Sequence, residues 1–564
     1  MKKRLVKIIS LALSILSVLS VTACGSGSGG IVKDKKTLNV KIHSAGYGVT
    51  YIEELKKGFE TAYSEEGYKV NVVTPDAALA NQLIYKEIYA DSGIDVYIAT
   101  ADARESTEYL GQQMFADITE SVMNQKVVGA NKVEGENTVL SYIEDRTSTA
   151  SYYYDGKFYG MPVAISIGGL GVNKKVLNDE FGITQLPRTT KEFQAIIQAI
   201  MVDNANDVAN GASYAQVTHP FAYALSGNAY WMTIFNSWFY QYSGKDAFES
   251  FWSFENTDGT AMTQDAYKVF DDEGLKVALS LLYQFYDYNS AISNASQTTY
   301  LKAQHDVMQG YAVFCPTGDW MFNEEKTVYS KYLKDITFIK APIVSELAVK
   351  VFGSGTSYNF TDEECEELLI KIVDGTDANM TVEEIKSSLA GTKYANVSNE
   401  DILMICQRRG ATKNSSGTSC YVSNKSTKKD IAALFLRYIA SADGAQIWSK
   451  ETNTTSPYAV GKLVEDYDWH KSVNAICLNK YCSYFESESI GYRKQLGVNI
   501  MIPEHEYLAR DIFNQSNSLY NDSNLMLKNG YSVANYRTWA NTLATSIYNK
   551  AKYNVENKVW KIPG

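Results

Sequence analysis

The chain has 564 residues and a formal net charge of −11 at pH 7, with 64 acidic against 53 basic residues. This acidic balance argues against nucleic acid as a partner, because phosphate contacts require clustered Lys and Arg. Hydrophobic residues make up an ordinary 45% of the chain, and the length exceeds what one hydrophobic core usually organises. We therefore expect a globular protein of at least two lobes.

The N-terminus has the pattern of an export signal. Four basic residues precede an apolar run, residues 8–19, and Ala23-Cys24 follows shortly after it. A small residue before a cysteine is typical of a lipobox, in which the Cys24 thiol carries the lipid after cleavage. We predict a lipoprotein signal peptide over 1–23, a flexible tether over 24–36, and a lipid anchor at the extracellular face of the cell membrane. The alternative, an uncleaved membrane anchor, requires a longer apolar run.

The next hundred residues alternate strand and helix patterns. Apolar residues alternate over 38–42, recur at helical spacing over 52–63, and continue as strand, helix and strand through 95–99. Such alternation predicts a parallel α/β sheet, in which ligands bind beyond the carboxyl ends of the strands. Two loops follow strands at this edge, and we single out Tyr47 in the first and Asp102 in the second. The alternative is that Tyr47 packs its loop and Asp102 caps a helix.

Residues 154–174 have the pattern of a passage from one lobe to another. Asp155-Gly156 predicts a tight hairpin turn, and strand-like residues follow it. Three glycines at the far end, Gly168, Gly169 and Gly171, allow the backbone to bend or to approach another chain closely.

This passage resembles the hinge entry of the sugar-binding proteins that serve ABC importers, the group that includes maltose-binding protein. The pattern Gly-Lys-x-Tyr-Gly-x-Pro-Val begins at Gly156, and Asn-Lys-Lys begins at Asn173. Further segments resemble the same group at residues 115–119, 186–193, 302–320 and 421–448. The last is the strongest match, because a strand ending in Ser-x-Lys-Ser precedes a helix and a closing Ser-x-x-Gly-x-x-x-Trp.

The resemblance implies a two-lobed α/β fold of the periplasmic-binding-protein type, which closes on its ligand by hinge motion. We place the hinge crossings near residues 165 and 422. The acidic helical patterns after residue 358 depart from the group and predict an extra helical insertion. The predicted parts are lobe I, 37–165 with 423–485; lobe II, 166–422 with 486–564; and the insertion within lobe II, 358–416.

The group places aromatic residues in its sugar cleft, which implies ligand-binding roles for Trp320 and for Tyr230 or Trp231. Pyranose rings pack their C–H faces on flat aromatic surfaces, while their hydroxyls require carboxylates such as Asp319 and Asp102. Structural alternatives remain for the tryptophans. Trp320 could fill the core of its lobe, and Trp231 begins an aromatic stripe at helical spacing, a pattern that usually forms core.

The resemblance implies a protein that captures a carbohydrate, in our interpretation an oligosaccharide, and delivers it to ABC transporter permease subunits. No nucleophile elbow, zinc-protease motif, P-loop or dinucleotide fingerprint occurs, and the five histidines are scattered. We therefore expect no enzyme activity, no cofactor and no metal, with mostly buried thiols among the six cysteines after Cys24. A secreted carbohydrate-active enzyme and a sensory ligand-binding lipoprotein are alternatives, and a peptide or polyol ligand stays open.

Overall fold

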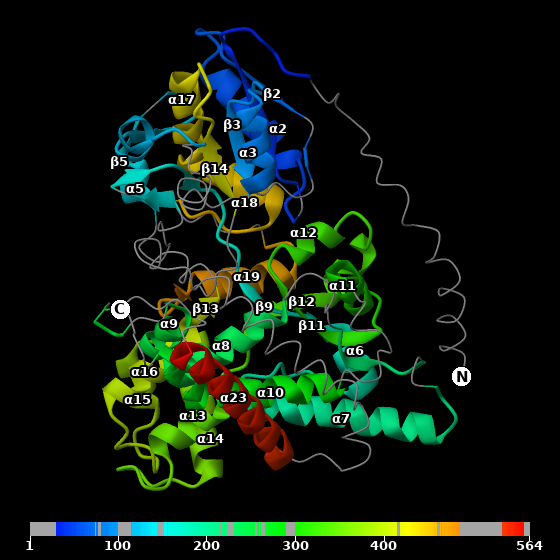
Figure 1. Cartoon of the computed structure of the whole chain (residues 1–564). Helices are drawn as coiled ribbons and strands as arrows, with labels where there is room; N and C mark the ends of the chain where they lie inside the picture. The colour runs from blue at the N-terminus through cyan, green and yellow to red at the C-terminus, as the bar shows by residue number, and fades with distance from the viewer. Residues whose placement is uncertain are drawn as a thin grey trace.

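Figure 1 shows the computed structural model of the chain, in which one lobe lies above another in the view. Each lobe has its own β-sheet with helices packed around it, so the predicted two-lobed α/β fold is confirmed. The structure describes residues 30–44, 46–73, 75–76, 81–99, 114–132, 134–143, 152–154, 156–213, 216–222, 230–253, 256–258, 260, 266–288, 299–413, 418–458, 463, 465–485 and 533–557.

Lobe I, the upper lobe of Figure 1, is built on a five-stranded sheet. Its strands in spatial order are β2 (Lys69–Val72), β1 (Thr37–Ile42), β3 (Val96–Ala99), β14 (Ser419–Val422) and β8 (Met161–Pro162). The predicted parallel pairing holds for β1 with β2 and β3, whereas β14 and β8 add antiparallel pairs. All six residues of β1 are buried, polar ones included, because elements cover both faces of the sheet.

Helices from both halves of the chain cover this sheet. They are α2 (Thr50–Ala62), α3 (Asn81–Tyr89), α5 (Val139–Tyr142), α17 (Lys429–Ile439) and α18 (Ala442–Thr452). Phe59 on α2 meets Phe435 on α17 edge-on, with ring centroids 5.1 Å apart. Smaller elements complete the lobe: the strand pairs β4 (Lys126–Val128) with β5 (Glu134–Thr138) and β6 (Tyr153–Tyr154) with β7 (Lys157–Phe158), and the single-turn helix η1 (Thr119–Met123).

Lobe II is built on a four-stranded sheet. Its strands in spatial order are β10 (His219–Phe221), β11 (Ala312–Gly318), β9 (Gly168–Asn173) and β12 (Ile336–Ile339). The glycine run of the sequence forms β9 itself, which is antiparallel to both of its neighbours. A β-carbon at Gly169 would lie 2.4 Å from the carbonyl oxygen of Ile339, so the glycine permits the close approach of β12.

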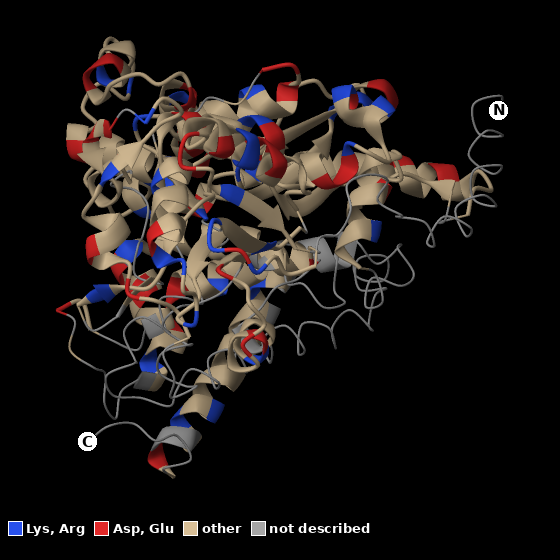
Figure 2. Cartoon of the chain, turned by 90° about the horizontal axis from the view of Figure 1, so that it is seen from above, with Lys and Arg blue, Asp and Glu red and all other residues tan. Residues whose placement is uncertain are grey.

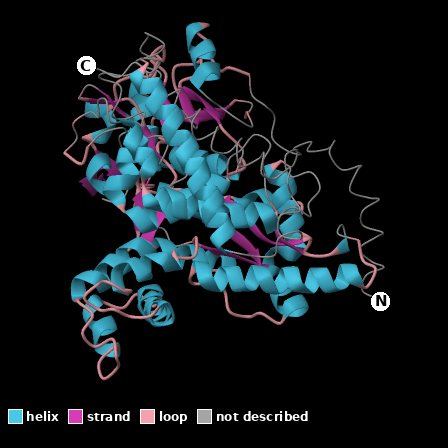
Figure 3. Cartoon of the chain, turned by 60° about the horizontal axis from the view of Figure 1, so that its bottom comes forward, coloured by secondary structure: helices cyan, strands magenta, loops and turns pink. Residues whose placement is uncertain are grey.

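Lobe II has many more helices than strands, and Figure 3 shows helices throughout the chain. They are α6 (Lys174–Phe181), α7 (Thr190–Ala209), α8 (Trp231–Ser243), α9 (Lys245–Ser253), η4 (Ala266–Asp271), α10 (Glu273–Tyr288), α11 (Tyr300–Met308), α12 (Met321–Glu325), η6 (Ser330–Asp335), α19 (Asp468–Cys477) and α23 (Val533–Glu556). The aromatic stripe of α8 is core, with Phe235, Trp238 and Phe239 at most 2% exposed. The C-terminal helix α23 packs against α10.

A helical unit extends lobe II on the side away from lobe I in Figure 1. Its helices are α13 (Ser345–Phe352), α14 (Asp362–Asp377), α15 (Val382–Ser388) and α16 (Asn399–Gly410), which share a hydrophobic cluster. Thr361 and Thr381 begin α14 and α15 with complete capping boxes. Arg188 joins the unit to lobe II through an ion pair of 2.8 Å with Asp374. The unit begins at α13, earlier than the predicted insertion 358–416.

Among the described residues the chain passes between the two lobes in three places, and described residues of the three passages lie side by side. The first leaves β8 and enters β9, and it passes Val163 and Ile165. Val163 N–H donates to the carbonyl of Thr418, next to β14, at 2.9 Å. Ile165 N–H donates to the carbonyl of Thr455, beyond α18, at 3.0 Å. The hinge is therefore a hydrogen-bonded group of three passages, where the sequence predicted two.

The predicted lobe boundaries need two corrections. Strand β14, assigned to lobe II, pairs with β3 in the sheet of lobe I. Residues 463–485, assigned to lobe I, belong to lobe II, because Trp469 on α19 packs on Phe338 at 5.1 Å and β15 (Ser483–Phe485) pairs with β13 (Ala411–Lys413). Both errors arise because a short buried strand or an amphipathic helix has the same pattern whichever lobe it joins.

The described residues also bear on the membrane, metals and charge. Among the described helices we find no candidate for a bilayer-spanning segment. No cluster of three His, Cys, Asp or Glu within the described ranges could hold a metal ion.

Cys406 on α16 and Cys420 on β14, which are close in sequence, are buried thiols without a disulfide. Figure 2 shows acidic and basic residues interspersed along the helices.

Candidate functional site

Trp320 lies where strand β11 ends and helix α12 begins, on the side of lobe II that faces lobe I. Gly318 ends the strand, and Trp320 directly precedes the first residue of the helix. A β-carbon at position 318 would lie 1.9 Å from Cζ3 of the indole. Glycine is therefore required there, because any side chain would occupy the space that the indole ring fills.

The indole contacts residues of both lobes. Tyr230, directly before α8, meets it edge-on with ring centroids 5.4 Å apart. From lobe I, Gly46 approaches so closely that a β-carbon there would lie 3.5 Å from Cβ of Trp320. Trp320 is 8% exposed and belongs to none of the four hydrophobic clusters of the described residues. Trp320 therefore lies at the boundary between the lobes, and its role in ligand binding stays a prediction.

Asp319, the neighbour of Trp320, is fully buried and faces the first crossing. Its Oδ1 accepts from Ile167 N–H at 3.3 Å, and its own N–H donates to the carbonyl of Ile167 at 3.0 Å. Burial raises the pKa of this carboxyl well above its ordinary value, although hydrogen bonds from backbone N–H groups oppose the shift. The contacts that the structure gives Asp319 therefore join β11 to the hinge.

Helices α11 and α12 bring four side chains together beside this point. Tyr300 and Gln304 lie on one face of α11, and Trp320 and Glu324 are likewise four residues apart at the start of α12. The two faces meet, because Gln304 Nε2 donates to Glu324 Oε2 at 2.9 Å. Tyr230 completes the group, since its ring also lies 5.6 Å from that of Tyr300.

The Glu324 carboxyl is only partly exposed, and this environment changes its ionisation. Its pKa is raised to about 7: burial is the main cause, the hydrogen bond from Gln304 opposes the shift, and the negative charge of Glu325 adds to it. Glu324 also adds to the raised pKa of Tyr300 and of Tyr47, for both of which burial is the main cause. The carboxyl therefore lies near aromatic hydroxyls of both lobes.

Tyr47 is buried on the lobe I side of the boundary. Its hydroxyl shares a hydrogen bond of 2.6 Å with Ser166 Oγ in the first crossing. Its ring lies 5.1 Å from that of Trp448 and 6.5 Å from that of His43. The observed contacts of Tyr47 are thus with the hinge and with its own lobe, and a ligand contact stays a prediction.

Helix α12 also reaches lobe I directly through two hydrogen bonds to backbone carbonyls. Asn323 Nδ2 donates to the carbonyl of Gly46 at 3.0 Å. Lys326, one residue past the helix, donates from Nζ to the carbonyl of Glu451 at 3.2 Å. These bonds join the segment that carries Trp320 to two separate elements of lobe I.

The remaining predicted residues lie elsewhere. Trp231 is 2% exposed in the core of lobe II, with its ring 5.9 Å from that of Phe235, so the structure does not bring it to Trp320 as it does Tyr230. Asp102 and Cys24 lie outside the described residues. The sequence interpretation missed Tyr300, Gln304, Asn323 and Glu324. The four-residue spacing of Glu324 from Trp320 was a signal that could have found one of them.

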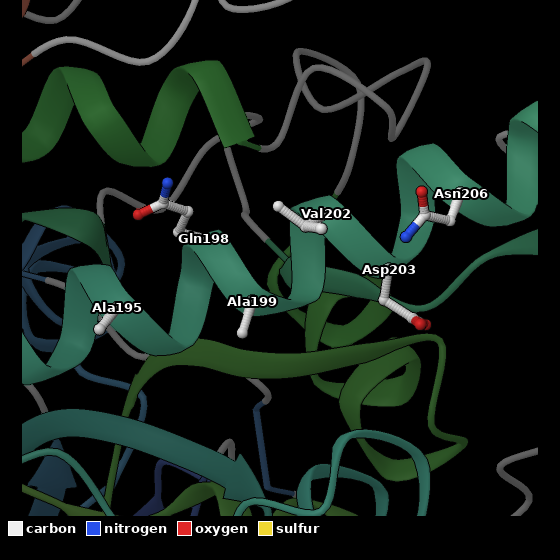
Figure 4. A pocket seen from close by; sticks show the side chains of 6 residues that line it. All are labelled: Ala195, Gln198, Ala199, Val202, Asp203 and Asn206. Carbon is white, nitrogen blue, oxygen red and sulfur yellow. The ribbon is translucent and has the colours of Figure 1, made fainter.

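A second feature lies far from this boundary. Figure 4 shows a hollow along α7, and the described residues that line it are Ala195, Gln198, Ala199, Val202, Asp203 and Asn206. They form one stripe of a single helix, which lies in Figure 1 on the side of lobe II away from lobe I. Polar groups do not converge there from several elements, so we centre the candidate site on the lobe boundary.

Comparison with known proteins tests the identity of this architecture. The family model for bacterial extracellular solute-binding proteins matches residues 54–366, more than half of the chain. The chain belongs to this family. The matched region includes the first crossing and the lobe II side of the boundary, with Trp320, whereas Gly46 and Glu451 on the lobe I side lie outside it. The family is one of binding proteins, which agrees with the expectation that the chain is not an enzyme. No curated protein sequence shows a significant match to the chain.

Solved structures of solute-binding proteins share the fold. RafE of Streptococcus pneumoniae in its apo form has a TM-score of 0.50 and 14% identity, covering 91% of this chain and 100% of its own. RafE in complex with raffinose has a TM-score of 0.50 and 14% identity over 90% of this chain and 99% of its own. The bacterial solute receptor AcbH, described as preferring β-D-galactopyranose, has a TM-score of 0.51 and 14% identity over 91% and 100%. At such identities the similarity shows the fold alone.

Proposed function

We propose that this solute-binding protein captures a carbohydrate, an oligosaccharide, outside the cell and delivers it to the permease subunits of an ABC importer. The observation that carries the proposal is the place of Trp320, an indole held between two lobes beside carboxyl and amide groups. Flat rings accept the C–H faces of sugars, and the adjacent polar groups suit their hydroxyls. The similar proteins RafE and AcbH, described with raffinose and galactopyranose, support this ligand class.

Within this proposal, Trp320 and Tyr230 are the aromatic contacts of the sugar. Asp102, Tyr47, Asp319 and Trp231 are further ligand contacts that the resemblance to sugar-binding proteins implies. Capture would involve rotation of the lobes about the three passages, with α12 and the loop at Gly46 meeting over the ligand. No catalytic residue, cofactor or metal has a part in it.

We further propose that Cys24 carries a lipid that anchors the mature chain to the extracellular face of the cell membrane. Residues 1–23 would then be the signal peptide, and 24–36 the tether to the membrane. Mass spectrometry of the N-terminal peptide from membrane fractions tests this directly. A mature N-terminal Cys24 that carries the mass of a lipid is the expected result, and an unmodified N-terminal Cys24 would contradict the anchor.

The experiment that tests the carbohydrate is a thermal-shift screen of the purified mature protein against neutral oligosaccharides, followed by calorimetry. A true ligand raises the melting temperature because it binds the folded state. Recovery of unchanged sugar after prolonged incubation separates binding from hydrolysis. Loss of uptake of the same sugar on deletion of the gene separates transport from sensing. If peptides or polyols bind and no oligosaccharide does, the proposed ligand class is wrong.

A further inference from the structure

The faces of α11 and α12 that meet at the lobe boundary combine aromatic rings with hydrogen-bond acceptors. The ring of Tyr230 lies between two others, with its centroid 5.6 Å from that of Tyr300 and 5.4 Å from that of Trp320. The side chain of Glu324 lies on the same face of α12 as the indole of Trp320. The two residues are one helical turn apart, and the backbone N–H of Glu324 donates to the backbone carbonyl of Trp320 at 3.1 Å. Three ring systems therefore lie beside one carboxyl.

The amide of Gln304 adds a second acceptor that has no donor of its own. Gln304 is fully buried, and its Nε2 donates both to Glu324 at 2.9 Å and to Thr317 Oγ1 at 3.2 Å. Its Oε1 has no hydrogen-bond partner among the described residues. A buried acceptor left without a donor is costly, so a donor from a bound molecule would satisfy it.

The charged groups around this cluster are mostly acidic. Glu324 and Glu325 follow one another on α12. The bases near the cluster in sequence are engaged in other contacts, and His305, next to Gln304, lies with its Nε2 3.3 Å from Glu325 Oε1. Lys326 donates to the carbonyl of Glu451 in lobe I, and Lys302 on α11 pairs with Asp306. An anionic group placed here would meet like charge, whereas a cation would find a carboxylate and the negative faces of aromatic rings.

We propose that this cluster, Tyr230, Tyr300, Gln304, Trp320 and Glu324, is a subsite for a protonated amine, such as that of an amino sugar unit. The proposal rests on the carbohydrate function above and names the substrate class of the same site. The ammonium group would donate to Glu324 and to Gln304 Oε1 while the rings pack on the sugar carbons. The raised pKa of Glu324 agrees, because a carboxyl that lacks a cation in a partly buried site holds its proton more tightly.

The test uses three monosaccharides that differ in charge: glucosamine, glucose and glucuronate. Binding to the mature protein at neutral pH is measured by calorimetry and by indole fluorescence. We expect glucosamine to bind about tenfold more tightly than glucose, with glucuronate weakest, from one charge-assisted hydrogen bond and cation–π contact. Glu324→Gln keeps the shape but loses the charge, so the preference should fall to about twofold or less. Glu363→Gln, an exposed residue of α14 away from the boundary, is the control and should keep the preference.

Two results overturn the inference: equal binding of glucose and glucosamine, or a preference for glucosamine that survives in Glu324→Gln. Absence of binding by all three monosaccharides overturns it as well, since the subsite then takes no amine. These results leave carbohydrate capture intact if neutral oligosaccharides bind in the thermal-shift screen. Failure of that screen would instead remove the proposed function. Folding of each variant is checked by its melting temperature.

Discussion

The two lobes contribute different kinds of groups to their boundary. Lobe II presents side chains, namely the indole of Trp320, the carboxyl of Glu324 and the amide of Asn323. Lobe I presents backbone, since the carbonyls of Gly46 and Glu451 receive the hydrogen bonds from α12. Its aromatic residue at this place, Tyr47, bonds to the crossing instead.

This difference indicates which lobe determines the selectivity for ligands. Backbone carbonyls are the same whatever the sequence, so they can close a boundary but discriminate poorly between ligands. Side chains on two helices of lobe II can match the shape and charge of one ligand class. We therefore expect substitutions in lobe II to change which ligand binds, and substitutions in lobe I to change how firmly the lobes meet.

The largest effect is expected for Trp320→Ala. Loss of a central aromatic anchor should weaken sugar binding by about 1 to 4 kcal/mol, measured by calorimetry with an oligosaccharide from the screen. Trp320→Phe keeps a flat ring and should retain part of the affinity. Gly318→Ala should mimic the loss, because its β-carbon would lie 1.9 Å from the indole and displace it. Unchanged affinity in Trp320→Ala would remove the residue from the site.

The ionisation of Glu324 gives a pH-dependent prediction for lobe II. Its pKa is raised from 4.5 to about 7, so folding is favoured while the carboxyl is protonated. That stabilising contribution is complete below about pH 4.5 and is lost as pH rises through about 7. Between pH 5 and pH 8 the free energy of unfolding of the wild type should fall by about 1 to 2 kcal/mol more than that of Glu324→Gln.

Urea unfolding at the two pH values measures this difference. The exposed residue Glu363 on α14 offers a control, since Glu363→Gln should keep the pH dependence of the wild type. If Glu324→Gln and wild type lose stability in parallel between the two pH values, the carboxyl is not held in the environment described above.

A smaller effect is expected where a side chain of lobe II meets the backbone of lobe I. Asn323→Ala removes the donor to the carbonyl of Gly46, a hydrogen bond of about 0.5 to 1.5 kcal/mol. The ligand-free protein should then become more expanded, which small-angle X-ray scattering measures as a larger radius of gyration. Asn210→Ala, at the end of α7 away from the boundary, should leave the radius unchanged. Equal radii for wild type and Asn323→Ala would show that this bond does not hold the lobes together.

The smallest effect is expected for the lobe I residue Tyr47. Tyr47→Phe removes the hydroxyl that bonds to Ser166 but keeps the ring on Trp448. The free energy of unfolding should fall by about 0.5 to 1 kcal/mol, measured by urea denaturation, with little change in ligand affinity. A loss of affinity as large as that of Trp320→Ala would contradict the proposal that side chains of lobe II determine which ligand binds.

Local patterns predicted most elements of the fold, because periodicity is a local property of the chain. The strand at 38–42 and the helix over 52–63 follow from alternation and from helical spacing, respectively. The same reasoning failed for β14 and for residues 463–485, since a short apolar segment does not say which lobe will bury it. Lobe assignment depends on contacts between residues hundreds of positions apart.

The candidate site was predictable only in part. The family resemblance singled out Trp320, and Gly318 two residues before it leaves the space that the indole ring fills. Tyr230 and Trp231 could not be distinguished, because adjacent residues face different directions once α8 packs: one meets Trp320 and the other enters the core. The spacing of Glu324 from Trp320 indicates that they share a helix face, but the contact of Gln304 with Glu324 forms only when α11 and α12 meet, and no spacing along the chain predicts it.

The bonded passages at Val163, Thr418 and Thr455 have a consequence for how the protein can be taken apart. A cut through the passage at Thr418 or at Thr455 leaves the other one hydrogen-bonded to the passage at Val163, and these two still span the lobes. We therefore expect fragments expressed separately, divided at one passage, to reassemble into a particle of native size. Because the three passages lie side by side, they should restrict the lobes to rotation about one axis and oppose rotation about any other.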